Sequence, residues 1–437
     1  MVYKRKLLLS LFMIAVFGAN AQEPVQKLVL GDAVRLAREK NRQISLAVND
    51  EKIAQSQFKQ TEAIWLPQVN LSYTGFTTNQ PLNAFGFKLQ QANVQQADFN
   101  PALLNNPGAT PNITTQLSVQ QPLFNPDLNY MRKAASKQAE VYGYQTQRTR
   151  EAVDMQVTNT YLQLEFTYEV VKVLEEALKT VQEIHRFTND RYQQGLMQKS
   201  DLLNVEVQVK AAETNLAEAR SQIKTISDQL SLLMNTPGGV IYTTEPVLID
   251  VPAVTAASVS AGRADLKAMS TAVSAYDLAI KSTAMSMLPK LNGFANYQYN
   301  DKSMFGFGAN AYLAGIQLSW DIFKGNQARN KKATQQLEKN KLQEQLQDML
   351  AKSDVEIRKT QTQLADTRYR IDQQTKAVEQ AAESLRIMQN RYTQGLVNTT
   401  DLLMAQTQLA QQKMLKAQAV FMQKNTVTYL QFLTTNQ

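Results

Sequence analysis

The sequence lacks most of the residue types on which catalysis and metal binding depend. Its 437 residues include no cysteine and a single histidine, His185. Without cysteine the chain has no disulfide, no reactive thiol and no cysteine to carry a lipid, so an exported form would depend on packing or assembly for its stability. A metal cluster would have to be built from carboxylates alone. We therefore expect no metal and no cofactor.

The short glycine-containing motifs of common enzymes are also missing. The sequence contains no G-x-S-x-G nucleophile turn, no P-loop and no G-x-G-x-x-G fingerprint. His185 lies in a long helical pattern, where a lone histidine is most simply a surface residue. We assign no catalytic residue and expect that the protein is not an enzyme.

Long apolar runs and basic blocks are absent as well. After residues 1–21 no apolar run reaches about 18 residues, the length that a transmembrane helix needs. If the protein enters a membrane, it does so as β-strands. The formal net charge of +8 falls to +5 without Lys4, Arg5 and Lys6, and the remaining charge is spread along the chain. No nucleic acid partner is expected from so diffuse a charge.

The N-terminus has the three parts of a secretory signal. Lys4, Arg5 and Lys6 precede an apolar run over residues 7–17, and Ala19-Asn20-Ala21 follows. A charged segment, about ten apolar residues and a small-x-small end are typical of a cleaved signal peptide. We expect export, with cleavage near Ala21.

One motif occurs twice, 200 residues apart. Arg-Tyr-Gln-Gln-Gly-Leu-Met-Gln-Lys-Ser-Asp-Leu-Leu begins at Arg191, and Arg-Tyr-Thr-Gln-Gly-Leu-Val-Asn-Thr-Thr-Asp-Leu-Leu begins at Arg391. Nine of the eighteen residues in 191–208 recur in 391–408. Each copy interrupts a long polar helical pattern at a glycine, so the repeat predicts a helix, a tight turn and a helix in each half.

The motif has a physical explanation as a turn. Gly195 and Gly395 supply the positive φ of a left-handed helix cap. We expect Ser200 or Thr400 to cap the next helix. Asp201 or Asp401 should favour the positive dipole end of that helix. Leu196 is expected to pack on Leu202 and Leu203, and the equivalent leucines are expected to pack in the second half. The motif is either a well-made hairpin or also a surface that binds a partner. A turn alone does not require Arg, Tyr, Gly, Leu and Asp together, which favours the second interpretation.

Each half also contains a pair of alternating segments. A helical pattern ends at Leu66-Pro67 and another at Leu288-Pro289, because proline disfavours helix at the preceding residue. Beyond each proline the apolar residues recur every second position, and a second alternating segment follows in each half. The apolar faces comprise Val69, Leu71 and Tyr73; Ile113, Leu117 and Val119; and Ile316, Leu318 and Trp320. Four strands of about ten residues with one apolar face are typical of outer-membrane barrels.

Four antiparallel strands cannot close on themselves, and lipid tolerates no open sheet edge. The smallest bacterial barrels have about eight strands, so a membrane barrel requires an oligomer. A half-buried sheet in a soluble protein is the alternative for any single strand. The connections 79–111 and 301–310 are expected to be extracellular loops.

Two long helices complete the halves. Beyond Pro126 in the first half and from residue 325 in the second, about 65 residues without proline run to each repeated motif, which at 1.5 Å per residue reach roughly 95 to 100 Å. Val157, Tyr161, Leu164, Tyr168 and Val171 step by four and three, the spacing of a coiled-coil seam. The return helices are expected from Asp201 to about Met234 and from Asp401 to about Leu433.

These features divide the chain into segments. We expect the following: signal peptide 1–21; N-terminal periplasmic helix 22–65; first strand pair with extracellular loop 66–124; first long helical hairpin 125–236 with its tip near 191–201; irregular linker 237–262; helix 263–287; second strand pair 288–324; and second long helical hairpin 325–437 with its tip near 391–401.

The chain resembles the TolC-type outer membrane efflux proteins over its whole mature length. The resemblance rests on the signal peptide, on two halves that each contain a helix, Leu-Pro, a strand pair and a hairpin, and on the duplicated motif Arg-Tyr-x-x-Gly-Leu-x-x-x-x-Asp-Leu-Leu. The resemblance implies a mainly α fold in which a homotrimer forms a 12-stranded outer-membrane β-barrel, continued by a periplasmic α-helical coiled-coil barrel. It implies an exit duct of a tripartite efflux or type I secretion system in the outer membrane of a Gram-negative bacterium. The implied partners are outer membrane lipid, a periplasmic membrane fusion (adaptor) protein and, indirectly, an inner-membrane pump of RND or ABC type.

The resemblance also assigns site residues. It places the adaptor-docking turn at Gly195, Leu196, Gly395 and Leu396, and closure of the aperture at Arg191, Tyr192, Asp201, Arg391, Tyr392 and Asp401. Tyr392 and Asp201 would be among the groups that tie adjacent helices together. The chain departs from the best known members at Val397, where they have an arginine, and at Met404, where they have an inward aspartate. The sequence therefore leaves open which residues lock the aperture.

Two other functions fit the sequence less well. An exported coiled-coil structural or adhesive protein without a pore would explain the long helices, but it has no use for four alternating strands at matching positions in two halves. A periplasmic hydrolase would need a catalytic constellation that the sequence lacks. The sequence of a passive duct does not specify its cargo, which can be drugs, metals or proteins, or the class of the partner pump.

Overall fold

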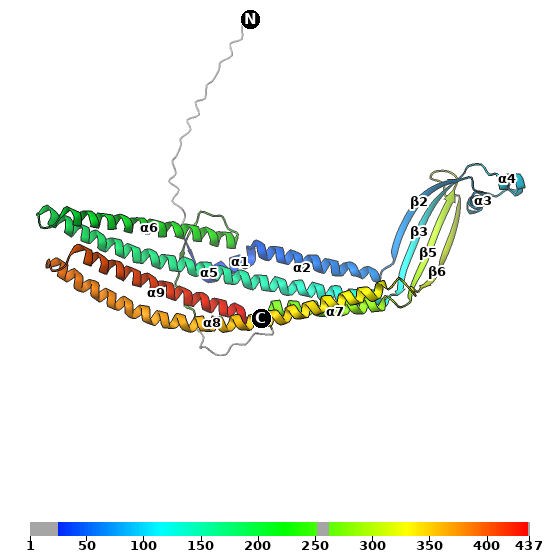
Figure 1. Ribbon diagram of the computed structural model, residues 1–437. Coiled ribbons are helices and arrows are strands. Elements are labelled where there is room, and N and C mark those ends of the chain that lie inside the picture. The colour runs from blue at the N-terminus through cyan, green and yellow to red at the C-terminus, as the bar shows by residue number, and fades with distance from the viewer. Residues whose placement is uncertain (1–24, 251–261, 436–437) are drawn as a thin grey trace, which may run out of the picture. The chain divides into compact units, whose positions relative to one another are not determined.

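The computed structural model describes residues 25–250 and 262–435, and the expected signal peptide with its cleavage near Ala21 lies outside these residues. The chain divides into two compact units. The tip unit comprises Met1–Asn41, Val153–Thr255 and Gln361–Tyr429, and the sheet unit comprises Arg42–Ala152, Ala256–Thr360 and Leu430–Gln437. Helices and strands are labelled in Figure 1.

The sheet unit contains a four-stranded antiparallel sheet in the order β2-β3-β5-β6 (Figure 1). Its strands are β2 (Gln68–Thr78), β3 (Thr110–Phe124), β5 (Lys290–Asp301) and β6 (Ala309–Ser319). Each half of the sequence contributes one adjacent strand pair, and β3 joins β5 at the centre. The two edges of the sheet, β2 and β6, come from different halves of the sequence.

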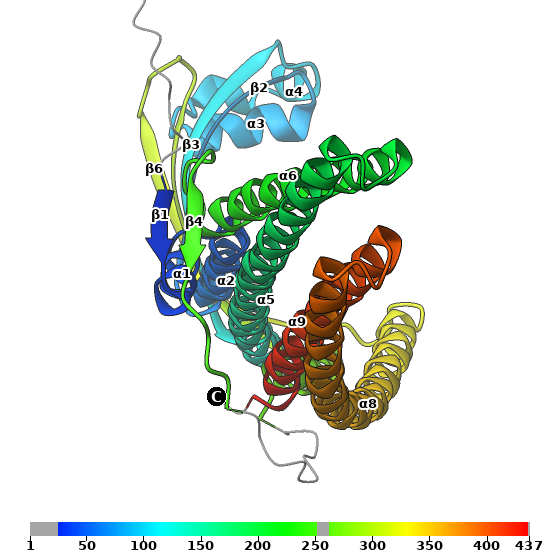
Figure 2. The ribbon, with the colours of Figure 1, turned by 90° about the vertical axis from the view of Figure 1, so that its left-hand side faces the viewer.

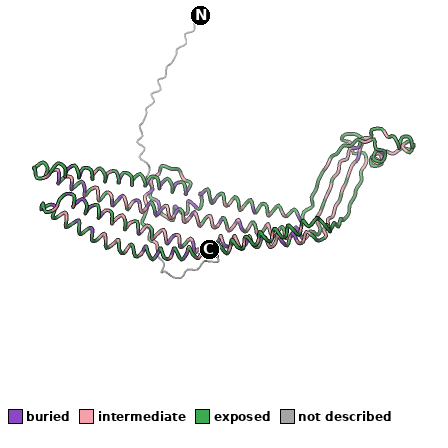
Figure 3. Tube along the Cα trace, in the orientation of Figure 1, coloured by how far each residue is buried: buried purple, intermediate pink, exposed green. Residues whose placement is uncertain are grey.

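The register gives this sheet one apolar and one polar face. Because directly paired residues project from the same face, one row across the four strands is Leu71, Leu117, Tyr297 and Tyr312. A row on the opposite face is Ser72, Gln116, Gln298 and Ala311. The predicted alternation is confirmed, but the apolar face is uncovered in the single chain, with Leu71 69% and Ile316 72% exposed. Most of each strand is exposed or intermediate in Figure 3.

Helices enter and leave the sheet where the prolines require it. Helix α2 (Arg42–Gln60) and the 3₁₀ turn η1 (Thr61–Ile64) end before Pro67, and α7 (Ala264–Met285) ends before Pro289. The segment between β2 and β3, expected as a loop, instead contains α3 (Pro81–Gln90), the 3₁₀ turn η2 (Gln96–Phe99) and α4 (Pro101–Asn105). Pro81 and Pro101 each begin a helix, the position where proline's missing N–H costs nothing, and this signal could have predicted both helices.

Four long helices form the two hairpins. They are α5 (Pro126–Gln193), α6 (Lys199–Met234), α8 (Gln327–Thr393) and α9 (Thr399–Thr434). In Figures 1 and 2, α6 runs alongside α5 and α9 alongside α8. None of the helices in the described part of the chain is long and apolar enough to cross a membrane.

The tip unit corrects two expectations about its remaining segments. The linker expected to be irregular contains strand β4 (Ile241–Thr244), which pairs in parallel with β1 (Val25–Leu28). The helix expected over residues 22–65 is interrupted at Asn41, where α1 (Leu30–Lys40) ends. The backbone of Asn41 leaves the helical region (ψ 132°), and its side-chain amide donates to the carbonyl of Leu233 over 2.8 Å.

The predicted seam of α5 is buried, but part of it faces the β1–β4 pair. Val157, Tyr161 and Leu164 are fully buried. The Tyr161 hydroxyl donates to the Leu28 carbonyl over 2.9 Å and accepts from the Glu245 amide over 2.9 Å. Burial raises the pKa of Tyr161 above its ordinary value, because the phenolate would lose its hydration. Tyrosine suits these seam positions because its hydroxyl satisfies backbone groups of the strands.

Candidate functional site: the hairpin tips

The two repeated motifs form the same helix-ending turn. In the first, the Gly195 amide donates to the Tyr192 carbonyl and the Leu196 amide to the Arg191 carbonyl, both over 2.9 Å. Gly395 and Leu396 make the equivalent bonds over 3.0 and 2.9 Å. This pattern is the Schellman motif, and it requires the positive φ of Gly195 (69°) and Gly395 (76°). The glycines are therefore explained by backbone geometry.

The helix caps differ from the expectation. Helix α9 begins at Thr399, and the Asn398 side chain, not Thr400, accepts from the Asp401 amide over 2.8 Å. Helix α6 begins at Lys199, and its N-cap residue, Gln198, makes no side-chain capping bond. Asp201 and Asp401 do lie in the first turns, where a carboxylate favours the positive end of the helix dipole.

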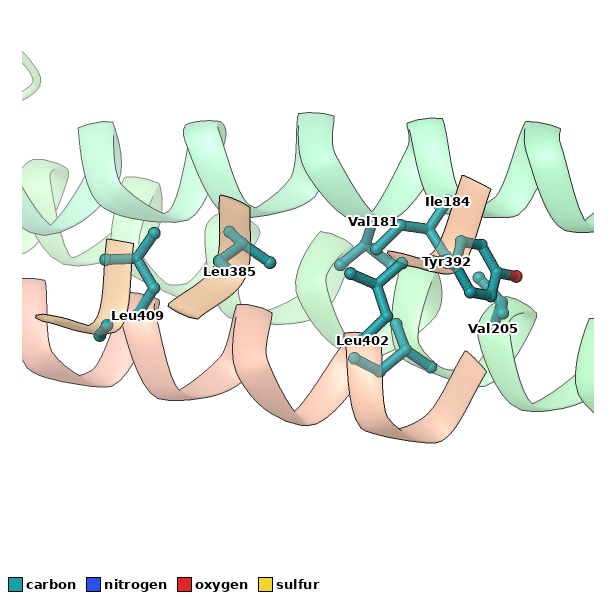
Figure 4. Close-up of a cluster of buried hydrophobic side chains, with 9 residues drawn as sticks. Val181, Ile184, Val205, Leu385, Tyr392, Leu402 and Leu409 are labelled. Atoms are coloured by element: carbon teal, nitrogen blue, oxygen red, sulfur yellow. The ribbon is translucent and has the colours of Figure 1, made fainter. Parts of the chain in front are cut away.

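Tyr392 is the buried centre of the tip. It is 3% exposed and belongs to an apolar cluster that draws on all four helices of the hairpins (Figure 4). In Figure 4 its ring lies beside Ile184 and Val205. The Phe187 ring lies 5.2 Å away, centroid to centroid. The remaining core members are Val181, Ala381, Leu385, Leu402, Leu403 and Leu409.

The hydroxyl of Tyr392 links the two hairpins. It lies 2.8 Å from Oγ1 of Thr188 on α5 and 3.0 Å from Oγ1 of Thr399 on α9. Because Thr188 donates its own proton to the Ile184 carbonyl over 2.8 Å, Tyr392 donates to Thr188 and accepts from Thr399. Through these bonds Tyr392 contacts both α5 and α9. We call Thr188, Tyr392 and Thr399 the hydroxyl latch.

Arg191 makes a second link between the hairpins. Its guanidinium donates to the Thr393 carbonyl at the end of α8 over 2.9 Å and lies 4.7 Å above the Phe187 ring. A side chain at Gly395 would lie in contact with it, since an added Cβ would be 3.6 Å from Arg191 Nη1. Arg191 thus caps the aromatic part of the cluster.

The remaining motif residues are divided between core and surface. Leu202 and Leu402 are buried, whereas Leu196 is 67% and Leu396 69% exposed, so the expected packing of these two turn leucines is wrong. Met197 and Val397 pack against the cluster in their place. Val397, which stands where a charge was expected, therefore serves apolar packing, while Met404 is 59% exposed.

The two copies of the motif have unequal environments. Tyr192 is 37% exposed, although its repeat equivalent is the buried Tyr392. Sequence reasoning missed Phe187, Thr188 and Thr399 because it followed residues that recur, and the equivalents of these three are Ile387, Met388 and Lys199. A polar residue four positions before an expected tip tyrosine was the available signal for Thr188.

Within residues 25–250 and 262–435, no group of three or more His, Asp or Glu is arranged to hold a metal ion. His185 is partly exposed, with Nε2 3.6 Å from a carboxylate oxygen of Glu206.

Comparison with known proteins agrees with this architecture. The family described as outer membrane efflux protein matches residues 33–236 and 257–435. No curated protein sequence matches the chain significantly.

Three solved structures share the fold at low sequence identity. VceC from Vibrio cholerae is 18% identical with a TM-score of 0.77, covering 92% of this chain and 95% of that one. The CmeC outer membrane channel of Campylobacter jejuni is 16% identical with a TM-score of 0.77, covering 92% and 85%. The MtrE outer membrane channel of Neisseria gonorrhoeae, in its open state, is 15% identical with a TM-score of 0.72, covering 92% and 88%.

The family match extends over both halves of the chain, including both hairpin tips and all four strands of the sheet. It also agrees with the non-enzymatic character expected from the composition. The chain belongs to the outer membrane efflux protein family and is a TolC-type efflux channel of the Gram-negative outer membrane.

Proposed function

We propose that this channel is a homotrimer whose twelve strands form one outer-membrane barrel, continued by a periplasmic helical tunnel, and that it conducts substrates passively. The observation that carries this proposal is the four-stranded sheet. Its apolar face is exposed, and β2 and β6 are unpaired edges among the described residues. Lipid does not tolerate an open sheet edge, and four strands are too few to close a barrel. A ring of three chains would pair every edge.

The two faces of the sheet suit lipid and water respectively. Residues of the apolar face would contact the outer membrane lipid. On the polar face, Asn112, Thr114 and Asn300 form a hydrogen-bonded group, with Thr114 Oγ1 donating to Asn300 Oδ1 over 2.8 Å and Asn112 Nδ2 donating to the same oxygen over 3.2 Å. Rows of amides and hydroxyls are the lining expected of an aqueous pore.

Aromatic side chains at both ends of the sheet support membrane insertion. Trp65 and Trp320, beside the helix junctions, are 55% and 59% exposed. Near the opposite end, Tyr312 is 82% exposed and Phe305 82% exposed. Aromatic belts at both interfaces are typical of outer-membrane barrels.

We propose that the hairpin tips dock a periplasmic membrane fusion protein, which connects the channel to an inner-membrane pump of RND or ABC type. Gly195 and Gly395 shape the docking turns, and Leu196 and Leu396 are their exposed apolar contacts. Two exposed leucines at equivalent positions of two turns would give a trimer six similar contacts around one opening.

Closure of the tip is proposed to rest on the hydroxyl latch and on Arg191. Tyr192, Asp201, Arg391 and Asp401 remain candidates for contacts between protomers, because Tyr192 is partly exposed and the aspartates lie at the helix starts. With Val397 packed against the apolar cluster and Met404 in place of an aspartate, the latch within each protomer is uncharged. We also propose that the signal peptide is removed near Ala21.

The experiment that tests this function separates it from the adhesive alternative. The full-length protein, expressed in a Gram-negative host, is expected in the outer membrane fraction as a detergent-stable trimer that dissociates on heating. It should form ion-conducting pores in planar bilayers. A monomer in the soluble periplasmic fraction, or a trimer without conductance, would contradict the duct and favour a surface protein without a pore.

A further inference from the structure

The internal repeat relates the two hairpins residue by residue. Helices α6 (Lys199–Met234) and α9 (Thr399–Thr434) have the same length and differ by 200 in numbering. The tip motifs on α5 and α8 differ by the same 200, and both helices run without interruption through the tip unit. A contact between the two hairpins can therefore be transferred to the equivalent pair of helices. For this, 200 is added to the residue number in the first hairpin and subtracted from the residue number in the second.

Within the chain, α5 packs antiparallel against α9. Glu176 pairs with Lys413 and Glu165 with Lys424, each over 2.6 Å. The two pairs are spaced 11 residues apart on each helix, so they fix a single register. Between them the Phe166 and Phe421 rings stack at 5.1 Å.

The equivalent surfaces of α6 and α8 are uncovered in the single chain. Leu203 is 48% exposed, whereas Leu403, which faces the core, is 9% exposed. On α6 the side chains that are exposed step by three and four, as along an unfilled seam, with the partly exposed Glu213 in the same row: Leu203, Glu206, Lys210, Glu213, Ala217 and Arg220. On α8, Tyr369 is 67% exposed and Ile387 39% exposed, and a shallow groove is lined by Glu379, Gln380, Glu383, Ser384, Ile387 and Met388.

We propose that the exposed face of α8 in one protomer packs against the exposed face of α6 in the next, in the register that α5 and α9 use within the chain. The occupant of both faces is thus a second copy of this chain. The two faces differ, so the contact is heterologous, and repetition of it closes a ring when the rotation allows. This inference rests on the proposed trimer and assigns the residues that join its protomers.

The charges on the two faces complement each other in this register. Subtracting or adding 200 converts the Glu176–Lys413 pair into Lys376 opposite Glu213 of the next copy, with the signs exchanged. The same register places Glu379 opposite Lys210, and Tyr369 opposite Arg220, a cation above an aromatic ring. Within one chain, Lys210 and Glu213 pair with each other on the surface, over 2.9 Å.

One like-charge approach occurs in this register, between Glu383 and Glu206. Each of the two already has a basic neighbour in its own chain. Glu383 pairs with Arg386 over 2.7 Å, and Glu206 lies 3.6 Å from His185. The Arg386 guanidinium therefore reduces the repulsion at Glu383, and the three favourable pairs outnumber this one approach.

Cysteine crosslinking tests the register directly, because the chain has no cysteine of its own. The Lys376→Cys/Glu213→Cys double variant of the full-length protein, purified from outer membranes and treated with a short thiol-specific crosslinker, should shift from monomer to covalent dimer and trimer on denaturing gels. The Glu176→Cys/Lys413→Cys variant should crosslink only within the monomer, which calibrates the method. Lys376→Cys/Glu206→Cys displaces one cysteine by about 10 Å along α6 and should yield no dimer.

A second measurement keeps the test independent of crosslinking chemistry. Lys376→Glu should lower the temperature at which the unheated trimer dissociates on gels, and adding Glu213→Lys should restore it. If the trimer forms but Lys376→Cys/Glu213→Cys gives only monomer, or if the displaced pair crosslinks equally well, the proposed interface is wrong while the trimeric channel stands. If the unmodified protein forms no trimer, the proposed function itself fails.

Discussion

Removal of one oxygen atom, in Tyr392→Phe, should open the tip. The Tyr392 hydroxyl is buried and bonds Thr188 and Thr399 over 2.8 and 3.0 Å, and the substitution deletes both bonds while leaving the ring in the cluster. A buried hydrogen bond contributes about 0.5 to 1.5 kcal/mol, so the loss is about 1 to 3 kcal/mol per protomer. If the bonds exist only in the closed tip, the ratio of open to closed states rises about 5- to 150-fold.

Conductance across a planar bilayer measures this change. Wild-type channels should show low conductance from closed tips, and Tyr392→Phe channels should show more frequent or longer high-conductance openings. Tyr192→Phe is the matched control, because Tyr192 is the repeat equivalent of Tyr392 and is partly exposed. Thr188→Val, which removes one of the two bonds, should give an intermediate effect. Tyr392→Ala is less informative, since a cavity in the cluster would cost about 3 to 5 kcal/mol and disturb the fold.

Two results would refute the reasoning. If Tyr392→Phe channels have wild-type conductance although their thermal stability falls, the latch holds the fold and not the gate. If Tyr192→Phe opens the channel as strongly as Tyr392→Phe, the effect does not come from the buried hydroxyl.

Three further perturbations follow from the same geometry. Leu196→Ser/Leu396→Ser removes exposed apolar contacts and should abolish export, measured as drug or protein efflux from cells, while trimers remain in the membrane; unchanged export would argue against docking by the turns. Gly395→Val forces a β-branched residue to φ 76° beside Arg191 and should destabilise the tip by about 1 to 3 kcal/mol in denaturant unfolding, whereas the exposed Gly31→Ala should be near neutral. Burial raises the pKa of Tyr161 and Tyr168, so their contribution to stability is complete below the unfolded pKa of 10.0 and is lost as the pH rises through the folded values. The Tyr161→Phe/Tyr168→Phe variant should therefore lose less stability at alkaline pH than the wild type. An unchanged slope of unfolding free energy against pH would contradict the assignment.

The sequence predicted well the features that depend on local periodicity. Alternation at Val69, Leu71 and Tyr73 identified a strand face that the register confirms. The positive φ of Gly195 and Gly395 followed from the break in a helical pattern, since few other residues adopt that geometry. Both depend on the spacing of side chains along one segment.

Features that depend on contacts between distant segments were missed. Strands β1 and β4 are four residues long and pair across more than 200 residues, so neither shows a period of its own. The motif predicts caps at Ser200 and Thr400, yet Asn398 caps α9, because this helix starts two residues earlier than the motif suggests. The latch partners Thr188 and Thr399 do not recur between halves, so the repeat could not reveal them.

By itself, the sequence determined that the chain consists of two similar halves, each with an alternating strand pair and a helical hairpin that turns at glycine. These properties follow from side-chain period and backbone sterics, which act within a few residues. Only the tertiary structure decided that Tyr392 is buried while Tyr192 is partly exposed, although both stand in the same motif. The environment of a side chain depends on which helix packs against it: Tyr392, on α8, contacts Thr188 and Phe187 of α5, whereas its equivalent Tyr192, on α5, is partly exposed in the described part of the chain.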